Sequence, residues 1–396
     1  MDWFLNRFLR RILYSPVVRI ITSVRVVLYT IRALSTLLLL SVIFLFSCKE
    51  YSGTEAPRNI ILCVGDGMGY EQIKAGSLFC SGKEEGLSFQ SFPIQGELKT
   101  ASADHEVTDS AAAATAMATG HKVANGVLSV AIPGDGHSLE TILERFARQG
   151  KGTGLVTTTM ITHATPAAFA AHVLTRTDTS RIAEQMISHS RPNVLFGGGG
   201  EGMSRSLAEE AGYLVVTNRA ELEKVSWTIP FNGWAAANSM FISGQFGLGH
   251  LPYEMDGLED LPSLSEMTQK ALELLENIST GFFLMVEGGR IDHAAHANDI
   301  ERLVREVAQF DRAVEEVVRW AQGRYDTLIL VTADHETGGL QVVLSRGKGV
   351  APQVSWTTSG HTAANVPLYA KGVSTEKFQG LHENTEIHDI LVSFDK

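Results

Sequence analysis

Three short apolar runs in this chain each end among acidic residues or histidines, and this repeated feature constrains the fold most strongly. The runs cover residues 59–65, 281–288 and 327–332. Short apolar runs bounded by glycine are typical of buried parallel strands, whose carboxyl ends share one edge of a sheet. Ligands of open α/β sheets bind at that edge. Asp66, Glu287 and Asp334 therefore predict an α/β fold with a polar site at one sheet edge.

Further residues of the metal-ligand type follow two of these runs. Asp292 and His296 are four apart, so they would share one face of a helical turn, within reach of one metal ion. His335 stands next to Asp334, and His361 follows a glycine further along the chain. A turn residue or a buried polar group would explain any one of them alone. Their joint placement favours a metal centre, because buried unpaired carboxylates are costly.

The stretch from Val107 to Gly120 predicts a helix that begins at an Asp-Ser pair. Ser110 to Thr119 are mostly good helix formers, four of them consecutive alanines, and Gly120 offers a stop. A helix N-terminus presents free N–H groups and positive potential, which suit an anion or a forming alkoxide. Asp109 and Ser110 could instead be ordinary capping residues. The small alanine side chains would let a substrate approach, and this favours Ser110 as a reactive hydroxyl.

The remaining segments predict alternating helices and strands around this site. Helices are expected at 138–150 with Ser138 as cap, at 264–278 and at 297–321, and strands at 153–158 and 193–196. Thr165 follows a strand end, and Arg176 carries the guanidinium suited to phosphate, although alone it would pass as a surface charge. The run Gly197–Gly200 lacks the pattern of a phosphate loop and is interpreted as a turn. Residues from about 201 to 262 are interpreted as an insertion.

The first 48 residues are unlike the rest of the chain. They contain six arginines, no lysine and one acid, Asp2, and residues 33–46 are almost wholly apolar. A basic region followed by a short apolar core is typical of a signal peptide, because the core is shorter than the ~20 residues that span a bilayer. The ending Leu-x-Ser-Cys resembles a bacterial lipoprotein signal with Cys48 as the lipidated residue. The segment predicts export to the periplasm or attachment to the outer membrane, with an uncleaved anchor as the alternative.

Charge and cysteine content narrow the classes of protein to which this chain could belong. The chain of 396 residues has a formal net charge of −11 despite its basic start, so nucleic acid is not expected as a partner. Beyond Cys48 only Cys63 and Cys80 remain, which excludes a disulfide framework. After a linker at 49–58, residues 59–396 form the predicted catalytic domain.

Taken together, the motifs resemble the alkaline phosphatase family. The segment Val107-x-Asp109-Ser110-Ala-Ala-Ala-Ala-Thr115 fits the nucleophile signature of that family. Five further blocks of sequence, from Asn59 to about His361, also fit the family and stand in the family's order. The resemblance implies a three-layer α/β/α sandwich with a mostly parallel central sheet and a small inserted cap or crown region. It also implies hydrolysis of phosphate monoesters, and it leaves room for a homodimer.

The resemblance also implies a role for each candidate residue. Ser110 would become phosphorylated, and Asp109 would orient Arg176, which would clamp two phosphate oxygens. Two zinc ions and one magnesium ion are implied. The implied ligands are Asp66, Asp334 and His335 for one zinc, Asp292, His296 and His361 for the other, and Asp66, Thr165 and Glu287 for magnesium. His163 and His293 would lie beside these ligands. His293 competes with His296 as a zinc ligand, and the spacing of four from Asp292 favours His296.

The chemistry of these residue types agrees with the implied reaction. A bound zinc ion lowers the pKa of a ligand water to about 7, and two metal ions can serve both ends of an in-line displacement. The arginine would offset charge on the phosphate oxygens. The related sulfatases need a different sequence after the nucleophile. A phosphodiesterase of the same superfamily stays open, although Arg176 favours a monoester, and so does a non-catalytic phosphate-binding surface protein.

Overall fold

The computed structural model describes residues 5–6, 35, 56–227 and 241–394. Nearly all of the predicted export segment 1–48, Cys48 included, and most of the linker 49–58 lie outside these residues, as do residues 228–240 of the predicted insertion. Within the described ranges, no helix is long and apolar enough to cross a membrane. The chain divides between residues 53 and 54, and the elements below all belong to the second unit.

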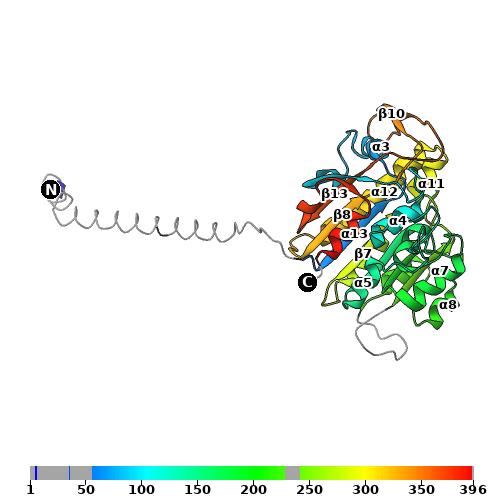
Figure 1. Cartoon of the computed structure of the whole chain (residues 1–396). Coiled ribbons are helices and arrows are strands. Elements are labelled where there is room, and N and C mark those ends of the chain that lie inside the picture. Colours follow the sequence, from blue (N-terminus) through cyan, green and yellow to red (C-terminus); the bar gives the residue numbers. More distant parts are fainter. Residues whose placement is uncertain (1–4, 7–34, 36–55, 228–240, 395–396) are drawn as a thin grey trace. The chain divides into compact units, whose positions relative to one another are not determined.

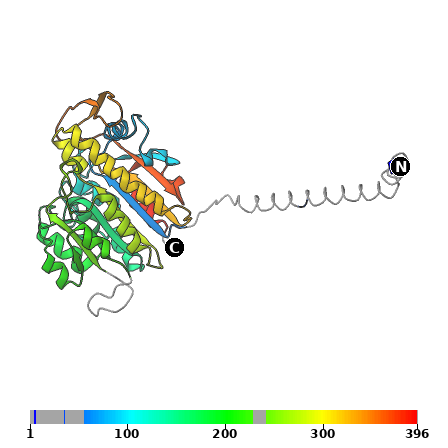
Figure 2. The ribbon, with the colours of Figure 1, turned by 180° about the vertical axis from the view of Figure 1, so that it is seen from behind.

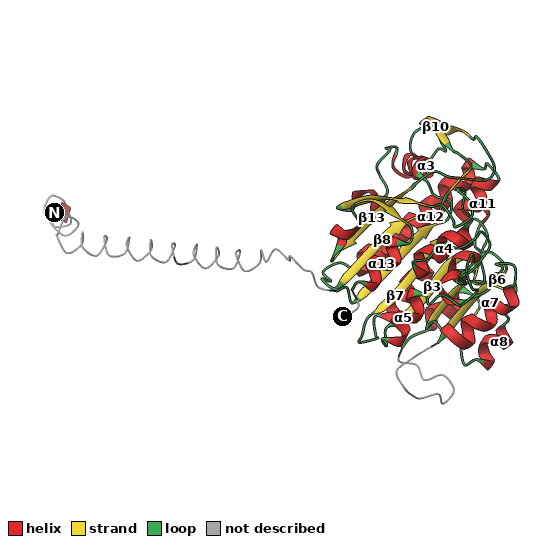
Figure 3. Ribbon diagram, viewed as in Figure 1, coloured by secondary structure: helices red, strands yellow, loops and turns green. Residues whose placement is uncertain are grey.

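Ten strands form one sheet in the order β14-β2-β13-β8-β1-β7-β3-β4-β6-β5. Figure 3 labels β13, β8, β7, β3 and β6 across this sheet. In chain order these strands are β1 (Asn59–Gly65), β2 (Ile94–Lys99), β3 (Gly152–Met160), β4 (Val194–Gly199), β5 (Leu214–Val216), β6 (Ile242–Leu248), β7 (Phe282–Gly288), β8 (Thr327–Thr332), β13 (Val366–Gly372) and β14 (Gly380–Glu383). All neighbours from β8 to β5 pair in parallel, and β13 runs antiparallel to both of its neighbours. The predicted, mostly parallel sheet is confirmed.

The three apolar runs of the sequence are the adjacent strands β8, β1 and β7. Leu62 in the middle strand lies opposite Met285 on one side and Leu330 on the other. Every residue of these strands is buried, which explains why the runs are continuously apolar and do not alternate. Because the three strands are parallel, the polar residues at their carboxyl ends emerge at the same edge.

Helices cover both faces of the sheet, as expected for a three-layer α/β/α sandwich (Figure 1; Figure 2). One face carries α4 (Ser110–Thr119), α5 (Ile142–Arg148), α6 (Ala164–Ala170) and α13 (Glu386–Val392). The other face carries α3 (Tyr70–Ser81), α10 (Leu264–Leu275) and the long helix α12 (Ile300–Trp320). The other α-helices in the described part of the chain are α7 (Thr179–Gln185), α8 (Arg205–Glu210), α9 (Arg219–Lys224) and α11 (Arg290–His296).

Helix α12 illustrates how the sequence pattern becomes packing. Leu303, Val307, Phe310 and Val314 recur at intervals of three or four and are all buried, so they form one apolar stripe toward the sheet. Phe310 reaches the end of β7 at Gly288, where a Cβ atom would lie 2.9 Å from the phenyl group. This close contact fixes the strand end that precedes α11.

Helix α5 is shorter than the helix predicted at 138–150. It begins after Thr141, whose hydroxyl accepts from the Glu144 N–H while the Glu144 side chain accepts from the Thr141 N–H. Ser138, the predicted cap, lies in an isolated β-bridge with Val130 instead. The reciprocal capping box satisfies two free N–H groups, and a serine without this partner satisfies fewer.

The glycine run also differs from expectation, and part of the predicted insertion joins the sheet. Gly197 to Gly199 continue strand β4 and are not a turn. The backbone passes very close at this point, since a Cβ atom at Gly198 would lie 1.5 Å from the carbonyl oxygen of Gly249. Only a glycine lets the chain after β6 cross at this distance. The segment 201–262, interpreted as an insertion, adds β5 and β6 to the edge of the main sheet.

Two small antiparallel sheets lie outside the main sheet. Strand β9 (Glu336–Thr337) pairs with β12 (His361–Thr362), and β10 (Gln341–Leu344) pairs with β11 (Gln353–Ser355). The first of these pairs places His361 next to the segment that follows β8, and in this way a residue distant in sequence joins the sheet edge.

Candidate metal and phosphate site

Helix α4 presents Ser110 at its first turn, and Asp109 is the residue that caps it. The Asp109 Oδ1 atom accepts from the Ala112 N–H at 3.0 Å, and Gly120 closes the helix in the left-handed conformation. All ten helix residues are buried. Ser110 is 3% exposed, and its Oγ lies 3.2 Å from Nε2 of His335. Asp109 is therefore the cap of the helix, and Ser110 is the first residue of the helix itself.

The first ligand group consists of Asp66, Asp334 and His335 at the ends of β1 and β8. The His335 Nε2 atom lies 3.4 Å from Asp66 Oδ1 and 3.2 Å from Asp334 Oδ2, and all three side chains are buried. Both Asp66 carboxylate oxygens and Asp334 Oδ2 have no hydrogen-bond partner among the described residues. Burial raises the pKa of Asp66 well above its usual range, and the neighbouring carboxylates add to this effect. Such a group fits a cation, because unpaired buried carboxylates cost free energy.

The second ligand group consists of Asp292, His296 and His361. The Nε2 atoms of the two histidines lie 3.1 Å apart, and they are 3.2 Å (His296) and 3.6 Å (His361) from the Asp292 carboxylate. The hydrogen bond that His296 donates to the Asp292 carboxylate raises the pKa of His296 to about 9, because the proton on the ring offsets negative charge as a cation would. Two imidazoles and a carboxylate are a donor set suited to zinc.

The third group shares Asp66 with the first group and adds Glu287 and His163. Burial raises the pKa of Glu287 to about 7, although hydrogen bonds from hydroxyl groups such as Thr157 lower it. The buried hydroxyl of Thr165 lies beside this carboxylate and, like that of Thr157, lowers its pKa. Oxygen donors of this kind suit magnesium. The structure brings the predicted ligands together here, and His163 lies within the group and not only beside it.

Arg176 reaches this region from a loop that precedes α7. Its Nη1 atom donates to Asp109 Oδ2 at 3.0 Å, and its Nη2 atom donates to His163 Nε2 at 3.3 Å. The guanidinium thus lies between the start of α4 and the third ligand group. These two bonds hold the guanidinium from two sides.

His293 belongs to a different cluster from His296. Its Nδ1 atom accepts from Arg290 Nη1 at 2.7 Å, and its ring lies 4.6 Å from that of His250 and 5.6 Å from that of His163. Burial lowers the pKa of both His250 and His293 to about 4. These rings are therefore neutral near pH 7 and line the side of the site at the third group.

His250 is a site residue that the sequence did not predict. The chain places it beside His293 after crossing Gly198, and its Nδ1 atom accepts from the Met160 N–H at 3.2 Å. The only local signal was a histidine after glycine in a segment without clear periodicity. The contact that positions it joins residues far apart in sequence, and no local pattern encodes it.

Glu336 and Gln72 were also missed. The buried Glu336 carboxylate accepts from Gln72 Nε2, from the N–H groups of Gly339 and Leu340, and from the Thr362 hydroxyl. These bonds hold the chain after His335 against the strand that carries His361. An acid next to the Asp-His pair was the only available signal, and its partner Gln72 is 264 residues away.

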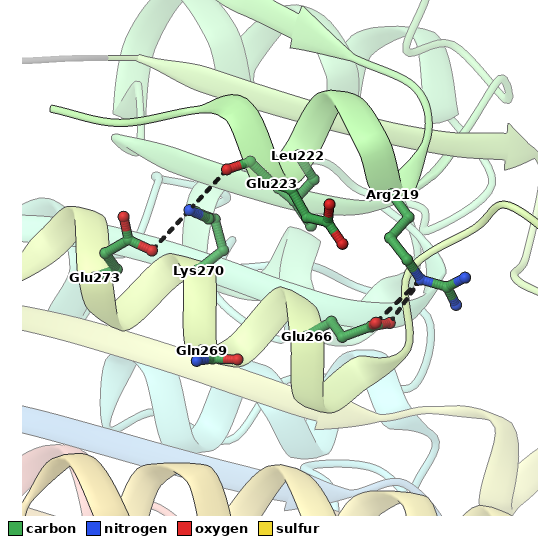
Figure 4. A pocket seen from close by; sticks show the side chains of 7 residues that line it. All are labelled: Arg219, Leu222, Glu223, Glu266, Gln269, Lys270 and Glu273. Carbon is green, nitrogen blue, oxygen red and sulfur yellow. Dashed lines mark hydrogen bonds and ion pairs between the residues drawn. The ribbon is translucent and has the colours of Figure 1, made fainter. Parts of the chain in front are cut away.

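A cavity of about 260 Å³ lies between α9 and α10, away from these ligand groups (Figure 4). Four of the charged side chains that line it form ion pairs, Arg219 with Glu266 and Lys270 with Glu273. Its lining includes none of the groups of converging acids and histidines found at the sheet edge.

The fold and the site define an α/β enzyme with a buried serine beside three groups of metal-ligand side chains. Comparison with known proteins gives the family. The alkaline phosphatase family model matches residues 57–352 and 348–396. The chain belongs to the alkaline phosphatase family, and it is a phosphatase.

Individual relatives agree with this assignment. Alkaline phosphatase 3 of Bacillus subtilis is 31% identical, over 86% of this chain and 89% of that protein. Streptomycin-6-phosphate phosphatase of Streptomyces griseus is 31% identical, over 86% of this chain and 91% of that protein. The solved alkaline phosphatase of the Antarctic bacterium TAB5 is 30% identical with a TM-score of 0.73, covering 86% of this chain and 98% of that one. A TAB5 variant with magnesium bound in its M3 site has a TM-score of 0.74, with 30% identity and coverage of 86% and 98%.

Proposed function

We propose that this phosphatase hydrolyses phosphate monoesters through a phosphoserine at Ser110. The observation that carries the proposal is the convergence, at one sheet edge, of the Ser110 hydroxyl, the Arg176 guanidinium and buried carboxylate oxygens without a hydrogen-bond partner. Ser110 attacks phosphorus, the ester oxygen leaves, and water then cleaves the phosphoserine to release phosphate. The free N–H groups at the start of α4 favour the negative charge that develops there.

Two zinc ions and one magnesium ion are the cofactors we propose. Asp66, Asp334 and His335 would hold one zinc, the group of Asp292, His296 and His361 would hold the other, and Asp66, Glu287 and Thr165 would hold magnesium. The buried oxygens without partners support this assignment, because each would otherwise cost free energy. When bound, these ions supply Lewis-acid chemistry, which makes a hydroxyl nucleophilic near neutral pH and stabilises a leaving oxygen.

Arg176 supplies the specificity for a monoester in this proposal. Asp109 holds one guanidinium nitrogen and His163 accepts from the other, so the side chain is oriented from two sides. A planar guanidinium binds two oxygens of a phosphate group at once. A diester has lost one of these oxygens to its second ester group, so it should be the poorer substrate.

The assay compares the metal-loaded protein with its Ser110→Ala variant on an aryl phosphate monoester and on the matching diester. We expect the variant to lose at least about 1,000-fold in kcat, because the nucleophile is missing. Ser91→Ala is the matched control, since this exposed serine bonds only the Ser88 carbonyl. Undiminished turnover by Ser110→Ala would overturn the mechanism, and preferred hydrolysis of the diester would favour a phosphodiesterase.

We also propose that the protein is exported and carries lipid on Cys48. The support is the basic and apolar sequence of residues 1–48 and its Leu-x-Ser-Cys ending. Mass spectrometry of the mature N-terminus tests this directly. A lipid-modified Cys48 as the first residue is expected, and an intact segment 1–48 would indicate an uncleaved anchor.

A further inference from the structure

Asn125 is bonded on three sides to the loop that precedes the candidate nucleophile. Its Oδ1 atom accepts from the Asp109 N–H at 3.1 Å, and its Nδ2 atom donates to the Val107 carbonyl at 3.0 Å. Its own N–H donates to Asp104 Oδ1 at 3.1 Å. The amide side chain therefore bonds the backbone on both sides of Thr108, directly before Ser110.

The next residue, Gly126, joins the same loop to the arginine segment. Its N–H donates to Asp109 Oδ1 at 3.1 Å, and its carbonyl accepts from the Arg176 N–H at 2.8 Å. Gly126 has a φ of +83°, which favours glycine at this point. Residues 125 and 126 thus contact the backbone and the side chain of Asp109 and the backbone of Arg176.

Asp109 links these contacts to the guanidinium. Its Oδ1 atom accepts from Ala112 and Gly126, and its Oδ2 atom accepts from Arg176 Nη1 at 3.0 Å. If the Asp109 backbone moves, both carboxylate oxygens move with it. The direction in which the Arg176 guanidinium points therefore depends on how firmly the Asp109 backbone is held.

We propose that Asn125 is a positioning residue that aims Arg176 at the phosphate group through Asp109. This inference rests on the proposed function, in which Arg176 binds phosphate oxygens. Asn125 itself touches neither the phosphate position nor any member of the three ligand groups in its hydrogen bonds. Its effect reaches the substrate only through the carboxylate that orients the guanidinium.

The segment that carries Asn125 has its own anchors, so removal of this side chain should leave it in place. Leu128 and Val173 exchange backbone hydrogen bonds at 3.0 Å in both directions. The Ser129 N–H donates to the Thr115 hydroxyl at 3.0 Å, and the Ser129 hydroxyl donates to the Ala168 carbonyl at 2.6 Å. Asn125→Ala should therefore loosen the Asp109 backbone and leave the rest of the segment in place.

The experiment measures the affinity of the zinc- and magnesium-loaded protein for inorganic phosphate by calorimetry, in a double-mutant cycle with Arg176→Ser. We expect Asn125→Ala to weaken phosphate binding about tenfold in the parent protein and less than about twofold in the Arg176→Ser background. Asn125→Asp keeps an oxygen that accepts from the Asp109 N–H, so it should lose less than Asn125→Ala. Asn277→Ala is the control, because that exposed amide bonds only helix carbonyls.

Three results would overturn the inference. One is an equal loss in both backgrounds, which would mean that Asn125 acts on the fold or on Ser110 and not through Arg176. The others are unchanged phosphate affinity in both Asn125 variants, and no measurable phosphate binding by the parent protein. Failure of the proposed function is a separate result, since it appears as absent or Ser110-independent ester hydrolysis while the phosphate-binding cycle is still measured.

Discussion

At the residue scale, each histidine of the second ligand group is held at the ring nitrogen that faces away from the group. His296 Nδ1 lies 2.6 Å from the Ser359 carbonyl, and His361 Nδ1 lies 2.8 Å from the Thr108 carbonyl. A neutral ring that donates from Nδ1 keeps its lone pair on Nε2, where a metal would bind. At His293 the Nδ1 atom accepts from Arg290, so this ring has the opposite arrangement.

This difference predicts which histidine binds zinc. His296→Ala should lose about one zinc ion per chain, because it removes one of three donors from a group whose other members cannot complete the site. His293→Ala should keep its zinc. Elemental analysis after dialysis measures both. The assignment is wrong if His293→Ala loses zinc and His296→Ala retains it.

The pair of His172 and Glu144, away from the ligand groups, should make the stability of the protein depend on pH. Burial lowers the pKa of His172, but the hydrogen bond to Glu144 at 2.8 Å outweighs it, and the net pKa lies above the usual value. The pKa of Glu144 lies below its usual value despite burial, because His172 and Thr141 bond the carboxylate. The histidine contribution to stability is complete below about pH 6.5 and is lost as pH rises through the raised pKa. The glutamate contribution is present above about pH 4.5 and is lost as pH falls through the lowered pKa.

We therefore expect His172→Gln to lower the free energy of unfolding most near pH 5.5, by about 1 to 2 kcal/mol, and less at pH 9. Urea unfolding at both pH values measures the difference. His137→Ala, which removes an exposed pair with Asp135, should change little at either pH. A loss from His172→Gln that is equal at both pH values would contradict the charged pair.

The candidate site was predictable to the extent that its signals are local. Ser110, Asp66, Asp334 and the pair of Asp292 and His296 stand at strand or helix ends that the pattern identifies. By contrast, the assignment of His361 to one particular ligand group came from the resemblance, because β12 reaches the sheet edge only by pairing with β9. His250, Asn125 and Gln72 act through contacts with distant segments, and no periodicity or motif marks such contacts.

At the element scale, the crossing of β4 by the chain after β6 is the feature on which the position of His250 depends. Gly198→Ala would put its Cβ 1.5 Å from the backbone carbonyl oxygen of Gly249, and a backbone atom cannot turn aside as a side chain can. We expect a loss of about 2 to 3 kcal/mol in unfolding free energy, measured with urea. Gly154→Ala in β3 is the matched control, since its nearest atoms are flexible leucine side-chain ends at 3.0 Å. Equal stability of the two variants would contradict this reading of the crossing.

The bounds of helices and strands were predicted most accurately where one strong local signal determines them. The boundaries of α4 follow from an alanine run and a terminal glycine, and β8 follows from six buried apolar or threonine residues. The start of α5 was placed too early, because the capping box at Thr141 outweighs a lone serine. The glycines of β4 were interpreted as a turn because their reason lies in a strand encoded about fifty residues later.

At the scale of the whole molecule, the ligand groups couple the stability of the fold to metal binding. Asp66, Glu287 and Asp334 are buried at the ends of adjacent strands, and Asp66 belongs to two groups. Without cations their charges destabilise the sheet edge, and ions that bind only the folded state restore stability by about 2.7 kcal/mol at a hundredfold excess over Kd. Removing metal with a chelator should abolish activity and lower the melting temperature, while the far-ultraviolet circular dichroism of the α/β core stays.

The same reasoning predicts that Asp66→Asn has opposite effects on the free energy of unfolding with and without bound metal. In metal-free protein near pH 8 the substitution removes a buried carboxylate whose raised pKa marks it as destabilising when charged, so unfolding free energy should rise by about 1 to 3 kcal/mol. With zinc and magnesium present the variant should be the less stable protein, because two groups lose a shared ligand. Urea unfolding of both proteins in both states measures the reversal. A loss of stability in the metal-free state would mean that Asp66 stabilises the fold through contacts of its own and not as a ligand.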